Sequence, residues 1–346
     1  MYIGNFNLDK KVFIIAELSA NHAGSLDLAL KSIEMAKKAG ANAVKFQTYT
    51  PNSLTLDCNK DDFIIKGGLW DKRTLFELYE KAKTPYEWHE KLFNHAKKHN
   101  ILCFSSPFSK EDVDFLKTFD PVAYKIASFE ANDEELIRYI AKQQKPTLLS
   151  TGIATKEELY RAIKIFKEEK NNKLIFLKCT SSYPSKTKDL NLNAIKTLKE
   201  QFNIRVGLSD HSFGNLAPIV ATTLGACVIE KHFMISKDIK SEDSGFSLDF
   251  NEFKSMVKSV RECEKALGKG SLKLNKKTLQ NRVFARSLYA SKDIKKGEIF
   301  TTTNVKSVRP SFGLHPKFFN QILGLKATRD IKFGEPLKEE HFKEKL

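Results

Sequence analysis

The stretch Ile204-Arg205-Val206-Gly207-Leu208-Ser209-Asp210-His211 decides the fold, because an apolar run ends in three polar residues. The same pattern returns one unit later, where residues 226–229 lead into Glu230-Lys231-His232. Short apolar runs of this kind are typical of buried parallel strands, and the segment between them is long enough for a helix. Both histidines are therefore predicted to lie at the ends of neighbouring parallel strands.

Six further apolar runs precede this pair and alternate with helix-length amphipathic segments. The predicted strands are residues 12–16, 43–47, 101–105, 122–127, 147–151, 174–178, 204–208 and 226–229. Eight βα units over roughly 255 residues match the size of a (β/α)8 TIM barrel. A doubly wound open sheet is the alternative that the same alternation permits.

Changes in composition and hydrophobic pattern divide the chain into a barrel, a linker and a second domain. Residues 1–267 form the predicted catalytic barrel, 268–281 a linker that begins Gly-Lys-Gly-Ser, and 282–346 a small domain. Two copies of one pattern, at 292–298 and 329–335, predict that this domain is pseudo-symmetric and β-rich. The long connection 48–84 is predicted to be a loop with short helices at the rim of the site.

Composition narrows the class of protein. The net charge is +16, but residues 269–346 hold 18 Lys and Arg against 7 Asp and Glu and so carry +11 of it. No nucleic-acid fold signature accompanies this charge, so no nucleic-acid partner is expected. A basic lobe over an anionic small molecule and a solvated lysine-rich surface both fit the distribution. The five cysteines lack short pair spacing, which favours free thiols over disulfides or a zinc cluster. No apolar run suits a membrane span or signal peptide, so a cytoplasmic location is expected.

Catalytic groups of a barrel lie at the C-terminal ends of its strands. The polar residues at or after the predicted strands are Glu17, Lys45, Gln47, Ser105, Ser106, Lys125, Ser128, Glu130, Ser150, Thr151, Thr180, Ser181, Tyr183, Ser209, Asp210, His211, Glu230 and His232. Lys45 and Lys125 are buried by this prediction, and burying a charged amine is costly unless an anion compensates it. A pocket for phosphate and carboxylate, a salt bridge to Glu17 or Glu130, and a Schiff-base lysine are three interpretations.

His211 and His232 allow two interpretations as well. Each could be a hydrogen-bonded core histidine, but two at adjacent strand ends, both beside acids, favour metal ligation. Two nitrogens with optional water or carboxylate suit Mn²⁺ or a similar divalent ion better than structural zinc.

Several motifs together resemble the bacterial sialic acid synthase family. These are IAELSANH (15–22), VKFQT (44–48), SPF (106–108), YKIAS (124–128), LSTG (149–152), CTSSYP (179–184), GLSDH (207–211) and EKHF (230–233). The tail with SVRP (307–310) resembles the family's C-terminal antifreeze-like (SAF) domain. Three stretches are most similar to the pseudaminic acid synthase group within the family: ELSANH (17–22), the insertion GLW (68–70) with RTLFELY (73–79) and TPYEW (84–88), and FGLHP (312–316).

The resemblance implies condensation of phosphoenolpyruvate with 2,4-diacetamido-2,4,6-trideoxy-L-altrose and water, which gives pseudaminic acid and phosphate through C–O cleavage. The product would pass to flagellin or a surface polysaccharide. Neuraminate or legionaminate synthesis is the alternative within the family, and a Schiff-base aldolase is the more distant one.

The resemblance also implies roles for individual residues. Phosphoenolpyruvate would be bound by Lys45, Ser106, Lys125, Ser128, Ser150, Ser181, Tyr183 and Ser209. Glu17 and Glu130 would orient water or sugar hydroxyls, while Asp243 and Arg309 would approach the sugar. His211 and His232 would hold a divalent metal, expected to be Mn²⁺ with Mg²⁺ or Co²⁺ as alternatives, that polarises the sugar aldehyde. Because Arg309 would reach the site of a partner subunit, a domain-swapped homodimer is expected.

Overall fold

A computed structural model describes residues 1–342 of the chain, which divide into two compact units, Met1–Gly268 and a second unit that begins at Lys269. Each unit is described by itself. The last four residues of the predicted small domain, 343–346, lie outside the described residues. No helix in the part described is long and apolar enough to cross a membrane.

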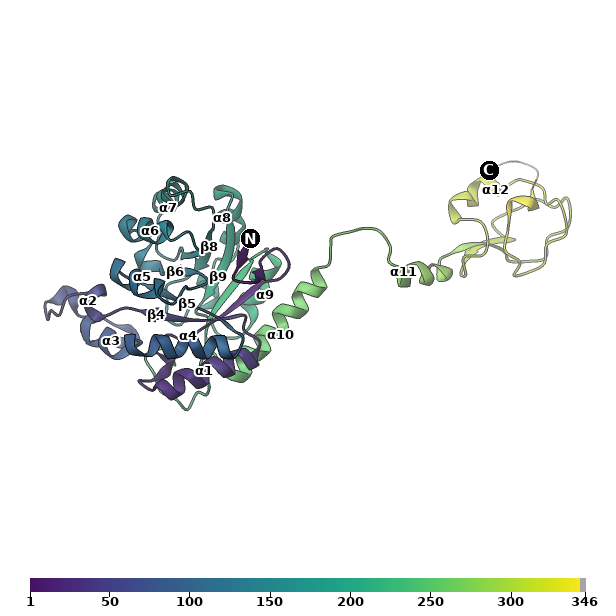
Figure 1. Cartoon of the computed structure of the whole chain (residues 1–346). Coiled ribbons are helices and arrows are strands. Elements are labelled where there is room, and N and C mark those ends of the chain that lie inside the picture. Colours follow the sequence, from purple (N-terminus) through teal and green to yellow (C-terminus); the bar gives the residue numbers. More distant parts are fainter. Residues whose placement is uncertain (343–346) are drawn as a thin grey trace. The chain divides into compact units, whose positions relative to one another are not determined.

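The first unit is a closed barrel of parallel strands, which confirms the predicted fold (Figure 1). The strands are β3 (Phe13–Glu17), β4 (Ala43–Thr48), β5 (Leu102–Pro107), β6 (Tyr124–Ile126), β7 (Thr147–Ser150), β8 (Leu174–Cys179), β9 (Arg205–Asp210) and β10 (Val228–His232). They pair in chain order, and β10 closes the barrel on β3, where His232 lies opposite Glu17. The last two strands run two or three residues beyond their predicted ends, so His232 lies within β10 rather than after it.

Helices surround the barrel strands (Figure 1). They are α1 (Leu26–Ala39), α2 (Pro51–Leu54), α3 (Leu75–Ala82), α4 (His89–Lys98), α5 (Lys110–Lys117), α6 (Glu134–Lys142), α7 (Lys156–Glu168), α8 (Ala194–Phe202), α9 (Leu216–Thr223) and α10 (Phe250–Leu267). Several begin with a side-chain cap, as at Thr155, whose hydroxyl accepts from Glu158 N at 3.2 Å. The helices α2 and α3 lie within the long connection 48–84, where short helices were expected.

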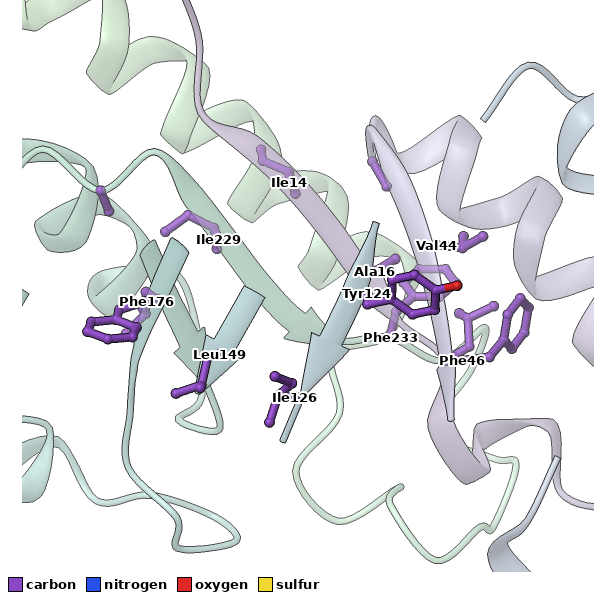
Figure 2. Close-up of a cluster of buried hydrophobic side chains, with 14 of the residues drawn as sticks. Ile14, Ala16, Val44, Phe46, Tyr124, Ile126, Leu149, Phe176, Ile229 and Phe233 are labelled. Atoms are coloured by element: carbon purple, nitrogen blue, oxygen red, sulfur yellow. The ribbon is translucent and has the colours of Figure 1, made fainter. Parts of the chain in front are cut away.

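The strands have two buried faces, and alternate residues point to each of them. One face packs against the helices, and Figure 2 shows side chains of this layer, among them Ile14, Val44, Leu149 and Ile229. The intervening residues point into the barrel. Its N-terminal end is filled with apolar side chains, and Ile3 joins this inner cluster from the hairpin of β1 (Tyr2–Ile3) and β2 (Phe6–Asn7). The buried polar residues of the inner face therefore gather at the C-terminal end.

In the two histidine motifs, consecutive strand residues point to opposite faces of the barrel wall. Asp210 and Lys231 are paired in the register of β9 and β10, and they share the outer, helix-facing side with Leu208 and Ile229. The Lys231 ammonium donates to Asp210 Oδ2 at 2.6 Å, and both side chains are fully buried. This ion pair therefore belongs to the barrel wall rather than to its cavity.

Replacing Lys231 with Met is expected to lower the free energy of unfolding of the barrel by about 3–5 kcal/mol, because it leaves the Asp210 carboxylate buried without its cation. Urea denaturation monitored by circular dichroism measures this change. The double variant Lys231→Met/Asp210→Asn removes both charges and should recover much of the loss. A single variant as stable as the natural chain would show that the pair contributes nothing.

The second unit places its two sequence repeats against each other. Ile294 and Ile331 exchange both backbone hydrogen bonds at 2.8 Å, and Asp293 accepts from Phe333 N while Asp330 accepts from Lys296 N, each also at 2.8 Å. The unit contains α11 (Lys276–Gln280), α12 (Phe319–Ile322) and the antiparallel pair β11 (Ser287–Ala290) and β12 (Val305–Val308). The predicted pseudo-symmetry is thus a direct pairing of the two repeats.

Candidate active site

A small cavity of about 60 Å³ lies at the C-terminal end of the barrel. It is lined by Glu17, Lys45, Gln47, Ser106, Lys125, Ala127, Ser128, Ser150, Cys179, Tyr183, Ser209, His211, Glu230 and His232. All eight strands, or the residues directly after them, contribute to this lining. Because inward positions recur every second residue, one strand can supply two of the groups, as β10 does with Glu230 and His232.

The two buried lysines and two buried glutamates of the cavity compensate one another. The Lys45 ammonium contacts the Glu17 carboxylate and donates to Ser106 Oγ at 3.1 Å. Glu230 lies between the lysines, with its oxygens 4.0 Å from Lys45 Nζ and 3.9 Å from Lys125 Nζ. The carboxylates therefore hold two ammonium groups in place, and these groups still have N–H donors for an anionic ligand.

The pKa values of the two glutamates shift in opposite directions. Burial raises the pKa of Glu17 to about 7, although Lys45 opposes this shift. Burial acts in the same direction on Glu230, but Lys125 and Lys45 outweigh it and lower the pKa of that carboxyl. Glu230 is thus the permanent counter-charge, and Glu17 is the carboxyl that can exchange a proton near neutral pH.

The two histidines project side by side into the cavity, with ring centroids 5.4 Å apart. His211 Nδ1 donates to the carbonyl of Thr180 at 3.1 Å, which leaves the other ring nitrogen of the neutral form with a free lone pair. His232 is buried, and its Nδ1 has no hydrogen-bond partner among the described residues. Burial lowers the pKa of His232 well below its usual value and keeps the ring unprotonated.

These residues fit a divalent metal ion. Such an ion needs imidazole nitrogens and carboxylate oxygens as ligands. His232 offers a buried nitrogen that makes no hydrogen bond among the described residues, and His211 offers a ring that is fixed through its other nitrogen. The carboxylate is that of Asp243, whose Oδ2 lies 3.7 Å from His232 Nδ1. Asp243 lies in the loop after β10, where it accepts from Ala20 N at 3.3 Å. The structure therefore brings the carboxylate that the resemblance assigned to the sugar next to the histidine pair.

Aromatic side chains cover the histidines. The Phe246 ring lies 4.8 Å from His232 and 5.1 Å from Tyr183, which in turn packs 4.4 Å from His211, measured between centroids. Trp70, from the long connection, reaches Tyr183 at 6.1 Å. These rings form an apolar wall beside the histidines, and a low local dielectric strengthens electrostatic interactions.

A larger pocket of about 620 Å³ lies beside this aromatic cover. Trp70 and Arg73 line it together with Glu242 and Lys240 from the loop after β10. Arg73 donates to the Glu242 carboxylate at 2.7 Å, and Trp70 Nε1 donates to the Glu242 carbonyl at 3.2 Å. The long connection is therefore tied to the Asp243 loop, and together they form a polar pocket outside the inner cavity.

Four predicted site residues lie outside the cavity lining. Ser181 lies at its edge, with its hydroxyl 3.9 Å from Cys179 Sγ. Glu130 follows Ser128 on a short 3-10 helix, where burial raises the pKa of its carboxyl to about 7 against the opposing effect of Lys125. Asp243 lies beside His232, and Arg309 belongs to the second unit, directly after β12. Their roles stay predictions.

Gln47 and Glu230 were among the predicted strand-end residues but had no assigned role, and Cys179 was not predicted; all three line the cavity. Glu230 precedes His232 by two positions, so strand periodicity alone places both on the inner face. Cys179 ends β8, and although burial opposes ionisation of its thiol, the contact with His211 lowers the pKa to about 7. Gln47 follows Lys45 by two positions in β4, so both lie on the inner face as well.

Gly152 gives two of the predicted ligand hydroxyls their positions. A Cβ atom there would collide with Ser181 Oγ and Ser128 Oγ, and Gly152 N donates to Ser128 Oγ at 3.2 Å. Because the resemblance implies that these hydroxyls bind phosphoenolpyruvate, Gly152→Ala is expected to lower kcat/KM for this substrate about 10²-fold, the loss that a displacement of about 1 Å can cause. Initial rates of phosphate release measure this effect. Unchanged rates with a stable fold would exclude the two hydroxyls from binding.

Comparison with known proteins identifies the family. The model of the NeuB family matches residues 32–272, and that of the SAF domain matches residues 285–343. The chain belongs to the NeuB family. It is 71% identical to the pseudaminic acid synthase of Campylobacter jejuni (strain 81-176) over 99% of this chain and 100% of that protein. It is 50% identical to the pseudaminic acid synthase of Helicobacter pylori over 96% and 98% of the two chains.

A solved structure shares the architecture of this NeuB-family chain. It is the N-acetylneuraminic acid synthetase of Leptospira borgpetersenii in complex with citrate. The TM-score is 0.73 with 33% sequence identity, and the match covers 81% of this chain and 94% of the other.

Proposed function

We propose that this chain is a pseudaminic acid synthase, which condenses phosphoenolpyruvate with 2,4-diacetamido-2,4,6-trideoxy-L-altrose and water. The observation that carries this proposal is the 71% identity, over nearly the full length of both chains, with a protein of that name. The cavity supports it, because it combines two lysine side chains, several hydroxyls and an imidazole pair in one small space.

Phosphoenolpyruvate occupies the lysine end of the cavity in this proposal. Lys45 and Lys125 face its carboxylate and phosphate, and the hydroxyls of Ser106, Ser128, Ser150, Ser181, Tyr183 and Ser209 complete the binding set. Ser209 Oγ donates to Glu230 Oε1 at 3.1 Å, so Glu230 fixes both this hydroxyl and the two ammonium groups. Preorganised donors of this kind stabilise charge that develops on the reacting oxygens.

The sugar approaches from the pocket beside Trp70, with its aldehyde toward the histidines. His211 and His232 would hold a divalent ion, expected to be Mn²⁺, whose Lewis acidity polarises the aldehyde carbonyl when it is bound. C3 of phosphoenolpyruvate bonds to the aldehyde carbon, water adds at C2, and the C2–O bond to phosphate breaks. Glu17 and Glu130, the two carboxyls with pKa values of about 7, are the groups that orient the water and move its proton.

Asp243 and Arg309 bind the sugar in this proposal. Asp243 already lies 3.7 Å from His232 and is tied to the backbone of Ala20. Arg309 comes from the SAF domain of a partner subunit in a domain-swapped homodimer. Arg309→Ala should therefore weaken use of the sugar far more than binding of phosphoenolpyruvate, and an equal loss of both would contradict this assignment.

Separate incubations with each candidate sugar test the proposed substrate. The chain is mixed with phosphoenolpyruvate and either the diacetamido-altrose or the sugar substrate of a neuraminate or legionaminate synthase, and phosphate release and product mass are measured. Turnover is expected with the altrose-configured sugar and is expected to be at least about 10²-fold slower with the others, because a mispositioned polar sugar leaves buried groups unpaired. Faster turnover of another sugar would reassign the enzyme within the family.

A further inference from the structure

Two histidines at the end of α4 face a glutamate of α1 on the helical layer of the barrel, away from the cavity. His95 lies in the last turn of α4, His99 at its C-terminal cap, and Glu34 in the middle of α1. Figure 1 shows α1 and α4 side by side, and the two helices are in contact. None of these residues lines the cavity at the strand ends.

The three side chains converge on one point. Glu34 Oε1 lies 3.3 Å from His95 Nε2 and 3.9 Å from His99 Nε2, and the three ligand atoms lie within 4.8 Å of one another. A Zn²⁺ ion with bonds of about 2.0–2.1 Å sets tetrahedral ligand atoms about 3.3 Å apart. Small side-chain rotations therefore bring all three atoms to the spacing that a metal needs.

Burial and charge argue that this cluster is more than a chance surface pair. The side chains of His95, His99 and Glu34 are 21%, 32% and 24% exposed, and His95 Nε2 is buried and makes no regular hydrogen bond among the described residues. The two imidazole rings lie only 4.4 Å apart between their centroids, so both face the same oxygen of Glu34. Lys31 binds the other oxygen of Glu34, Oε2, at 3.2 Å and leaves Oε1 directed at the histidines.

We propose that Glu34, His95 and His99 form a second divalent metal site, for an ion that favours imidazole, such as Zn²⁺. Two imidazoles and one carboxylate supply three ligands, and water completes the tetrahedron. The ion ties α1 to α4 and stabilises the helical layer of the barrel, because it binds the folded chain and not the unfolded one. This site is independent of the proposed synthase activity.

Zinc stoichiometry of the untagged full-length chain tests the site. Equilibrium dialysis against Zn²⁺ measures the number of ions bound per chain. The variants Glu34→Gln, His95→Gln and His99→Gln are each expected to bind one ion fewer than the natural chain. Glu90→Gln is the matched control, because it removes an exposed carboxylate from α4, the helix that carries His95. This variant should bind as much zinc as the natural chain. His211→Gln tests the active site separately, so the loss of one site is distinguishable from the loss of the other.

Thermal unfolding gives a second readout. Zn²⁺ should raise the melting temperature of the natural chain and of Glu90→Gln more than that of His99→Gln, while all three retain Mn²⁺-supported phosphate release. Equal zinc content and equal thermal shifts in the natural chain and the three ligand variants would overturn the proposal. The same result would identify the cluster as an ion pair between Glu34 and the histidines only.

Discussion

Treatment with a chelator is expected to abolish phosphate release from phosphoenolpyruvate, and added Mn²⁺ is expected to restore it. His232→Gln should lower kcat by about 10²- to 10³-fold or more, because electrostatic stabilisation of a reacting carbonyl contributes on that scale. The unpartnered Nδ1 of His232 and the fixed ring of His211 are the structural basis of this expectation. Steady-state phosphate release at saturating phosphoenolpyruvate and sugar measures the effect.

Two comparisons make this test specific to the active-site pair. His211→Gln should behave like His232→Gln, whereas His95→Gln, on the outer layer, should keep full Mn²⁺-supported activity. Turnover that resists the chelator, or full activity in His211→Gln, would show that the imidazole pair does not act through a metal.

Lys45→Met is expected to reduce kcat/KM for phosphoenolpyruvate by about 10²- to 10³-fold, since truncating one partner of a buried, hydrogen-bonded charge pair costs about 2–5 kcal/mol. The variant loses the contacts of this ammonium with Glu17 and Ser106 and leaves the Glu17 carboxyl buried without its neighbour. Initial rates over a range of phosphoenolpyruvate concentrations separate the effect on KM from that on kcat.

A double variant distinguishes binding from folding at this position. Lys45→Met/Glu17→Gln removes both charges, so its stability toward urea should approach that of the natural chain while its activity stays low. Recovery of activity in the double variant would show that Lys45 serves only to neutralise Glu17, and the lysine would then have no direct part in binding phosphoenolpyruvate.

The sequence predicted the barrel well because strand periodicity is a local property. Once β4, β6, β9 and β10 are recognised as strands, alternation places Lys45, Lys125, Ser209 and His232 on the inner face. The same rule places Glu230, two positions before His232, on the inner face and Lys231 on the outer face with Asp210.

Groups carried by loops or by separate helices could not be placed in this way. The approach of Asp243 to His232, and the contacts of Trp70 with Tyr183 and Glu242, depend on long loops whose paths leave no periodic signal. Glu34 and His95 meet only because α1 and α4 pack side by side, although 61 residues separate them along the chain. Only a packed structure reveals such contacts, which are non-local by nature.

Bridge-labelled phosphoenolpyruvate, with ¹⁸O between C2 and phosphorus, tests the central claim most directly. The labelled substrate is turned over with 2,4-diacetamido-2,4,6-trideoxy-L-altrose, and both products are weighed by mass spectrometry. The account predicts a nine-carbon keto acid of the mass of pseudaminic acid, with the label entirely in inorganic phosphate. Label retained in the sugar acid, or no condensation with this sugar, would contradict the account.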